Sequence, residues 1–360
     1  MSDSLRVGIA GAGSIALGTA AFLSNHGHDT MLWSPSGIST KGLETGISAE
    51  GALDLTFKVR IAKSAKALVA SNEVLIIALP AYGHKVVMDK LAPYIHERQK
   101  VIVSSHASLG AVYLAQLLNA RGISVPITAW GTTIVTGKRC NKKGVRVNTV
   151  RDSVDLCTVP ETRSNCALTV CKKLFGNRFK SRKGLLAISL SNLNPQNHLG
   201  IALGNITRME RGEIWSQGQN VTPRIGRLLE KLDIERLAIA KALGVKVKTI
   251  FEHFHLSFHI PIESISKMNQ QMHAKGNGGI GPATAHSRYI IEDVPYGLQL
   301  TVMLGKLVNR PAILHEAGIQ IFSAMYDRDF SNENELLNAL DLNSYNLKNL
   351  QQAARTGLLH

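Results

Sequence analysis

The sequence predicts an α/β N-terminal domain with a parallel sheet, followed by an all-α C-terminal domain. Three observations support this fold class. Short apolar runs alternate with helical segments in the first third of the chain, and a glycine-rich turn follows the first run. Beyond residue 184, apolar residues recur at helical spacing. The 360 residues suit two or three domains, and a composition with 44% hydrophobic and 19% charged residues argues against a disordered chain.

The elements of the N-terminal domain alternate as strand, helix and strand. We expect strands at 5–10, 30–33, 74–79, 101–104 and 126–129, and helices at 15–25, 86–94 and 111–120. The apolar run from Val74 to Leu79 ends at Pro80 and is typical of a parallel strand buried on both faces. Alternation in 144–150 indicates a hairpin or edge strands, and a helix follows at 162–175. We assign residues 1–183 to this domain.

The second domain, residues 184–360, is predicted to be helical. Apolar residues recur at helical spacing between Arg224 and Leu243, and Gly244 is a natural stop for that helix. Further helices are expected at 298–308, 311–326 and 332–340. The apolar helices near the C-terminus are compatible with a homodimer.

The basic residues are unevenly distributed. The formal net charge is +15, and residues 138–183 hold 13 basic against 3 acidic residues. Such a stretch fits nucleic acid, a membrane surface, a field that attracts acidic small molecules, or a solvated face. Nucleic acid is disfavoured because aromatic residues make up only 5% of the chain. No run reaches the roughly 18 apolar residues of a membrane span, so we expect a soluble, cytoplasmic protein without a membrane partner.

The four cysteines give no metal or disulfide signal. They form no C-x-x-C pair and have no histidine at zinc spacing, so we expect no metal site and a reducing compartment.

The first glycine-rich turn predicts a dinucleotide site. Gly11-Ala-Gly13-Ser14-Ile15-Ala16 reads G-x-G-x-x-A, directly after a strand and before a helix. Gly11 permits the tight turn, Gly13 lets the backbone approach a pyrophosphate, and Ala16 lets the helix pack close to the strand. The free N–H groups at the helix N-terminus then bind the phosphates. The sequence therefore predicts a Rossmann domain.

The end of the second strand favours NADP over NAD. An NAD site usually has an acidic residue there to bind the ribose hydroxyls. Here Trp33 is followed by Ser34-Pro-Ser36, and Asp29 lies at the opposite end of the strand. Ser34 and Ser36 can bind a 2′-phosphate and Lys41 can neutralise it. NAD stays open because no arginine follows directly.

Two segments of the helical half suggest catalysis. Residues 191–200 are rich in amides and contain His198, and residues 287–297 bring Arg288, Glu292 and Asp293 together. Hydride transfer to a carbonyl or imine needs a proton donor, which histidine suits, and a carboxylate fixes its tautomer. His198 could pair with Asp293, with Glu292 as a rival, although Asp293 could equally cap a helix. Arg288 could bind a substrate carboxylate bidentately.

The chain resembles the octopine/nopaline (opine) dehydrogenase family over nearly its whole length. The resemblance is carried by Gly11-Ala-Gly13-Ser-Ile-Ala16, Ala78-Leu-Pro80-Ala-Tyr-Gly-His84, Asn194-Pro-Gln-Asn-His198, Leu232-Asp-Ile-Glu-Arg236 and Arg288-Tyr-Ile-Ile-Glu-Asp-Val-Pro-Tyr-Gly297. It implies a catalytic pair at His198 and Asp293 and a substrate-binding Asn194. It also implies NAD(P)H-dependent condensation of an amino acid with a 2-oxo acid. The segment after Trp33 lacks the acid of NAD-using members, and the basic stretch matches no family motif.

Two other functions remain open from the sequence. A simple 2-oxo-acid reductase of the ketopantoate type shares the plan of the two domains but needs no amine. A non-catalytic dinucleotide sensor would use the basic stretch to bind a partner.

Overall fold

The computed structural model describes residues 4–358 and divides them into two compact units. The first comprises the described residues up to Ser189 together with those from Lys348 onward, and the second comprises Leu190–Leu347. The boundary lies inside helix α6 (Leu185–Ser191), a few residues after the predicted division at 183/184. The prediction also gave the C-terminal helix α15 (Leu347–Thr356) to the second domain. This helix packs in the first unit, where Arg355 pairs with Glu161 at 2.7 Å.

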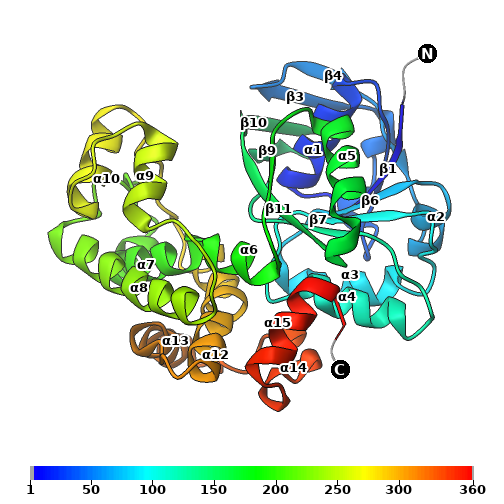
Figure 1. The fold of residues 1–360 in the computed structure, drawn as a ribbon. Coiled ribbons are helices and arrows are strands. Elements are labelled where there is room, and N and C mark those ends of the chain that lie inside the picture. Colours follow the sequence, from blue (N-terminus) through cyan, green and yellow to red (C-terminus); the bar gives the residue numbers. More distant parts are fainter. Residues whose placement is uncertain (1–3, 359–360) are drawn as a thin grey trace. The chain divides into compact units, whose positions relative to one another are not determined.

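An eight-stranded sheet forms the centre of the first unit, in the order β12-β11-β8-β7-β6-β1-β2-β5 (Figure 1). Its strands are β1 (Arg6–Ala10), β2 (Asp29–Trp33), β5 (Arg60–Ile61), β6 (Val74–Ile77), β7 (Lys100–Val103), β8 (Ile127–Trp130), β11 (Val154–Val159) and β12 (Phe179–Ser181). The five strands predicted from apolar runs are all present. As expected for a strand covered on both faces, every residue of β6 is buried.

The sheet is parallel, as predicted, except between one pair of neighbouring strands. β11 runs antiparallel to β8, whereas the other neighbours in this sheet pair in parallel. A parallel connection needs a crossover, usually a helix. Between β8 and β11 the chain instead forms two further strands, so it re-enters the sheet in the opposite direction.

Those two strands belong to a second, four-stranded sheet of order β4-β3-β10-β9. β9 (Val135–Asn141) and β10 (Gly144–Val150) form the predicted hairpin. β10 also pairs in parallel with β3 (Ile47–Gly51), which pairs with β4 (Leu55–Phe57). Strands β3 and β4 were not predicted from the sequence. The hairpin packs against helix α1 (Ser14–Asn25), so the start of the basic stretch lies beside the glycine-rich turn.

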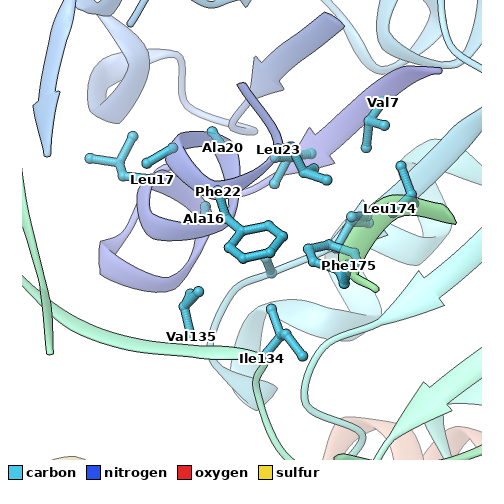
Figure 2. Packing of buried hydrophobic residues seen from close by; sticks show 14 of the residues in the cluster. Val7, Ala16, Leu17, Ala20, Phe22, Leu23, Ile134, Val135, Leu174 and Phe175 are labelled. Carbon is cyan, nitrogen blue, oxygen red and sulfur yellow. The ribbon is translucent and has the colours of Figure 1, made fainter. Parts of the chain in front are cut away.

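Helix α1 lies in the core of this unit, and its residues 16–23 are all buried. Figure 2 shows Phe22 of α1 between Ile134, Val135 and Phe175, and the rings of Phe22 and Phe175 stack with centroids 5.5 Å apart. The other helices of the unit before α6 are α2 (Ala65–Ala70), α3 (His84–Leu91), α4 (Gly110–Asn119) and α5 (Ser164–Phe175). Their positions agree with the predicted helices, except that α2 was not predicted.

The second unit is helical, as predicted. Its helices are α7 (Asn194–Glu210), α8 (Pro223–Ala242), α9 (Ile250–Phe258), α10 (Ile265–Ala274), α11 (Arg288–Ile291), α12 (Gln299–Leu307), α13 (Ile313–Tyr326) and α14 (Glu335–Leu340). A π-helical segment, Val294–Leu298, lies between α11 and α12. Helices α7, α9 and α10 were not predicted, because their polar residues weaken the apolar periodicity. Within residues 4–358 no helix is both long and apolar enough to cross a bilayer.

Candidate active site

Gly11 ends strand β1 in a conformation that favours glycine. Its φ is +136°, and a Cβ placed there would lie 2.2 Å from the Ala78 carbonyl oxygen. Its N–H donates to the Trp33 carbonyl at 2.8 Å, which ties the turn to the end of β2. The methyl group of Ala16 packs beneath Gly11, and Ala16 is fully buried. These contacts agree with the roles predicted for Gly11 and Ala16.

Gly13 and the start of α1 fit a bound phosphate. A Cβ at Gly13 would meet nothing within 4 Å, so the backbone can be approached closely. Helix α1 begins at Ser14, followed by Ile15, and its first turn has neither a side-chain cap nor an acidic residue. Its N–H groups therefore remain available to an anion.

Arg139 of strand β9 also contacts the glycine-rich turn, and this contact was not predicted from the sequence. Its backbone N–H donates to Ser14 Oγ at 3.0 Å, and its Nη1 donates to the Ala12 carbonyl at 3.0 Å. The guanidinium thus places a fixed positive charge at the glycine-rich turn. The only sequence signal was the basic stretch itself, which did not reveal where the hairpin would pack.

The end of β2 offers hydroxyl groups where a ribose is usually bound. Ser34 is buried, and its Oγ has no hydrogen-bond partner among the described residues. Ser36 is exposed and accepts the N–H of Ile38 at 3.3 Å. Asp29 lies at the opposite end of the strand and pairs with Arg60 at 2.7 Å. An unsatisfied buried hydroxyl at this position fits a dinucleotide.

Two glycine substitutions separate folding from cofactor binding. We expect Gly11→Ala to lower the melting temperature, because the new methyl group meets the Ala78 carbonyl and the left-handed backbone. Gly13→Ala should leave the melting temperature unchanged but raise the KM for the dinucleotide, because its methyl group points into the space a phosphate would use. Thermal unfolding and steady-state kinetics of both variants test this pair. A destabilised Gly13→Ala protein would contradict it.

Polar groups also gather after strands β6 and β7. Pro80, predicted to lie near the cofactor, is exposed and directly precedes a short 3₁₀ helix, Ala81–Gly83. His84 is buried and its Nε2 lies 3.0 Å from the Leu79 carbonyl oxygen. His106 is buried too. Burial lowers the pKa of His84 to about 4, and burial together with the nearby His84 lowers that of His106 to about 3.

In the second unit, helix α7 carries the predicted N-x-x-x-H motif. Asn194 is its first residue, and Pro195 occupies a first-turn position that tolerates proline. The Asn194 side chain is exposed, and Asn194 and His198 share one helical face because they are four residues apart. His198 lies one turn further along and is buried.

His198 and Asp293 form a buried pair. The Nδ1 of His198 lies 2.6 Å from Oδ2 of Asp293, and the two side chains are only 11% and 8% exposed. Asp293 precedes the π-helical segment, but its side chain makes no capping hydrogen bond, so its carboxylate is directed to the histidine. Within residues 4–358 no other hydrogen bond to the His198 ring is present. Nε2 therefore has no hydrogen-bond partner among those residues.

Tyr289 stacks on one face of the His198 imidazole, a contact that was not predicted from the sequence. The two ring centroids are 3.5 Å apart and the planes differ by 10°. The Tyr289 hydroxyl donates to Gln217 Oε1. Burial raises the pKa of Tyr289 to about 12, so the phenol stays protonated. The sequence signal for Tyr289 was its place directly after Arg288, in the segment from which Arg288 was predicted.

Arg288 of α11 is largely exposed, whereas Glu292, directly after the helix, is mostly buried. Arg288 is 58% exposed, and its Nε lies 3.5 Å from Oε2 of Glu292. The carboxylate partner of His198 is thus Asp293, and the rival Glu292 pairs with Arg288.

A second buried ion pair supports the helix that carries His198. Asp233 and Arg236 of α8 are paired at 2.6 Å, and Asp233 Oδ1 also accepts Gln196 Nε2 at 2.9 Å. Because Gln196 lies in the first turn of α7, this network fixes that turn two residues before His198. The Leu232–Arg236 motif therefore holds the first turn of α7 in place and acts on His198 only through that helix.

Two family models match the chain. Residues 181–326 match the α-helical domain of the NAD/NADP octopine/nopaline dehydrogenases. Residues 7–132 match ketopantoate reductase PanE/ApbA. The matched ranges fall in the second and first units respectively, apart from the few residues around α6.

The chain is also similar to two named proteins along most of its length. An opine dehydrogenase of Arthrobacter sp. (strain 1C) is 28% identical, covering 98% of this chain and 99% of the relative. A vitopine synthase of Allorhizobium ampelinum is 24% identical, covering 89% of this chain and 92% of the relative.

Solved structures share the fold. An octopine dehydrogenase bound to NADH and L-arginine matches with a TM-score of 0.81 at 15% identity, covering 99% of both chains. A yersinopine dehydrogenase bound to NADP⁺ matches with a TM-score of 0.73 at 14% identity, also covering 99% of both chains. Residues 181–326 therefore match the α-helical domain of the NAD/NADP octopine/nopaline dehydrogenases, and the whole chain is similar in sequence and fold to opine dehydrogenases.

Proposed function

We propose that this protein is an opine dehydrogenase. It condenses the amine of an amino acid with a 2-oxo acid and reduces the resulting imine to a secondary amine that bears two carboxylates. The observation that carries the proposal is the buried His198–Asp293 pair in a unit matching the helical domain of this family.

His198 acts in this proposal as the general acid and base. Asp293 forms a hydrogen bond with Nδ1 of His198, and this bond fixes the tautomer and stabilises the imidazolium. His198 then donates its Nε2 proton to the carbonyl or carbinolamine oxygen. The carbinolamine oxygen leaves as water, and in the reverse reaction His198 takes the proton back. The buried position keeps the pair out of bulk water, where its electrostatic effect would be weakened.

Gly11, Gly13 and the start of α1 would hold the dinucleotide, which would supply the hydride for reduction of the imine carbon. We favour NADPH over NADH, because no carboxylate follows Trp33 and the hydroxyls of Ser34 and Ser36 with the amine of Lys41 suit a 2′-phosphate. Arg139 adds positive charge at the neighbouring turn.

Arg288 is the proposed partner of a substrate carboxylate, with Asn194 as a further substrate ligand. We expect Arg288→Lys to raise the substrate KM by about tenfold, because lysine cannot form the paired N–H contacts of a guanidinium. Turnover at saturation should change little. The matched control is Arg211→Lys, since Arg211 also pairs with a glutamate, at 3.7 Å, but is 79% exposed. An unchanged KM in Arg288→Lys would remove this assignment.

The function is tested by a screen of amino acids crossed with 2-oxo acids, run with NADH and with NADPH. The proposal predicts cofactor oxidation only when both substrates are present. Oxidation with a 2-oxo acid alone would favour the ketopantoate-type reductase, whose model matches residues 7–132. Dinucleotide binding without oxidation by any pair would favour a non-catalytic sensor. Comparing kcat/KM for NADPH and NADH tests the cofactor preference.

Two expectations accompany this function. A homodimer is supported by apolar side chains on α13, since Ile313, Ile321 and Met325 are exposed. A cytoplasmic location is supported by four free cysteines, which suit a reducing compartment. Light scattering after size-exclusion chromatography tests the first, and cell fractionation tests the second.

A further inference from the structure

The His198 imidazole is held from two directions by residues that are far apart from it in the chain. Asp293 bonds Nδ1 in the ring plane at 2.6 Å, and Tyr289 lies parallel to one ring face at 3.5 Å. A single hydrogen bond leaves the ring able to tilt about its bond to Cβ. A flat surface against one face removes that tilt.

Tyr289 is itself fixed at both ends. Its backbone N–H donates to Ser287 Oγ at 3.3 Å, at the start of α11. Its hydroxyl donates to Gln217 Oε1, and the Gln217 N–H donates to the Gly279 carbonyl at 3.1 Å. The tyrosine plane is therefore set by two separate segments of the second unit, which a side chain serving only to fill space would not need.

We propose that Tyr289, anchored by Gln217, is a positioning residue that orients the His198 ring and stabilises its protonated form through the aromatic face. The proposal rests on the proposed function of His198 as acid and base. An aromatic face attracts a cation lying over it, so the imidazolium formed during the reaction gains more than the neutral ring does. The charged groups that act on Tyr289 are Asp293, which bonds the imidazole at Nδ1, and Arg288, which precedes Tyr289 in α11.

The kinetic test compares Tyr289→Leu with Tyr289→Phe. Leucine removes the aromatic face, so we expect kcat to fall about three- to tenfold while the KM for the dinucleotide stays constant. Phenylalanine keeps the face and should restore most of the lost turnover. Gln217→Leu, which removes only the anchor, should resemble Tyr289→Phe. Tyr326→Phe is the control, since it also removes a tyrosine hydroxyl, and that hydroxyl bonds the Ala285 carbonyl at 2.7 Å rather than Gln217.

A spectroscopic test needs no substrate. A ring stacked at 3.5 Å shifts the proton resonances of its neighbour upfield. In protein with labelled histidine, the His198 ring protons, assigned through His198→Asn, should move downfield in Tyr289→Leu but not in Tyr289→Phe. Circular dichroism and the melting temperature report whether the variants are folded.

The two measurements separate the failure of this inference from failure of the proposed function. Unchanged His198 resonances and unchanged kcat in folded Tyr289→Leu would overturn the positioning role. Equal losses in the leucine and phenylalanine variants would also overturn it, because the face would then not matter. If the wild-type protein lacked opine dehydrogenase activity, the resonance shift would still show whether Tyr289 orients His198.

Discussion

Replacing His198 with alanine should lower kcat by about a hundredfold to ten-thousandfold, the range for losing general acid–base catalysis. The reason is that Nε2 of His198 is the proposed proton donor, while Asp293 occupies Nδ1. Initial rates at saturating amino acid, 2-oxo acid and dinucleotide measure the effect. Full activity in the purified variant would mean that another group supplies the proton.

His198→Asn makes this experiment sharper. The alanine variant leaves the Asp293 carboxylate buried without a partner, which costs stability on its own account. An asparagine amide can occupy the position of Nδ1 and donate to Asp293, yet it carries nothing at the position of Nε2. We expect His198→Asn to keep a wild-type melting temperature and lose turnover as severely as His198→Ala. A stable, fully active asparagine variant would contradict the acid–base role.

The second large effect is a loss of stability in acid. The pKa of His84 is lowered to about 4 and that of His106 to about 3, chiefly by burial, against 6.5 in the unfolded chain. Between pH 6.5 and about 4 the unfolded chain therefore binds protons that the folded chain does not. The free energy of unfolding falls as the pH falls, by about 1.4 kcal/mol per pH unit for each histidine. At neutral pH this cost is absent.

Urea unfolding at pH 7, 5.5 and 4.5 measures the acid effect. Trp130 fluorescence reports on the first unit, where both histidines lie. In the double variant His84→Gln, His106→Gln the slope between pH 6.5 and 4.5 should fall by about 3 kcal/mol per pH unit, because both titrating groups are gone. His286→Gln, at an exposed position in the second unit, is the control. The same slope in the double variant and in the wild type would contradict this origin.

Strands and helices with strong local patterns could be predicted from the sequence. Val74–Ile77 is apolar at every position and Arg224–Leu243 has a helical period, so each pattern is contained in contiguous residues. Strands β3 and β4 were not predicted, since Ile47–Gly51 and Leu55–Phe57 are short and only partly apolar. They form because β10 and β3 pair across nearly a hundred residues, which no local window contains.

The candidate site divides in the same way. Gly11 and Gly13 lie in a local turn, so residue type and spacing were enough to predict the turn, and their role in dinucleotide binding stays a prediction. The pairing of His198 with Asp293 was expected partly from a family resemblance, and its catalytic role stays a prediction. Arg139 and Tyr289 were missed because an arginine in a basic stretch and a tyrosine in a helix look like many others.

The order of the apolar runs, the glycine-rich turn and the change to helical spacing determined the two-part plan from sequence alone. These features depend on backbone sterics and periodicity within a few neighbouring residues. Only the tertiary structure decided that β11 runs antiparallel, that α15 returns to the first unit and that Arg139 reaches the turn. It also gave the geometry of the His198–Asp293 pair, whose members are 95 positions apart. Such contacts depend on which distant surfaces pack together, and that choice minimises the free energy of the whole chain rather than of any one segment.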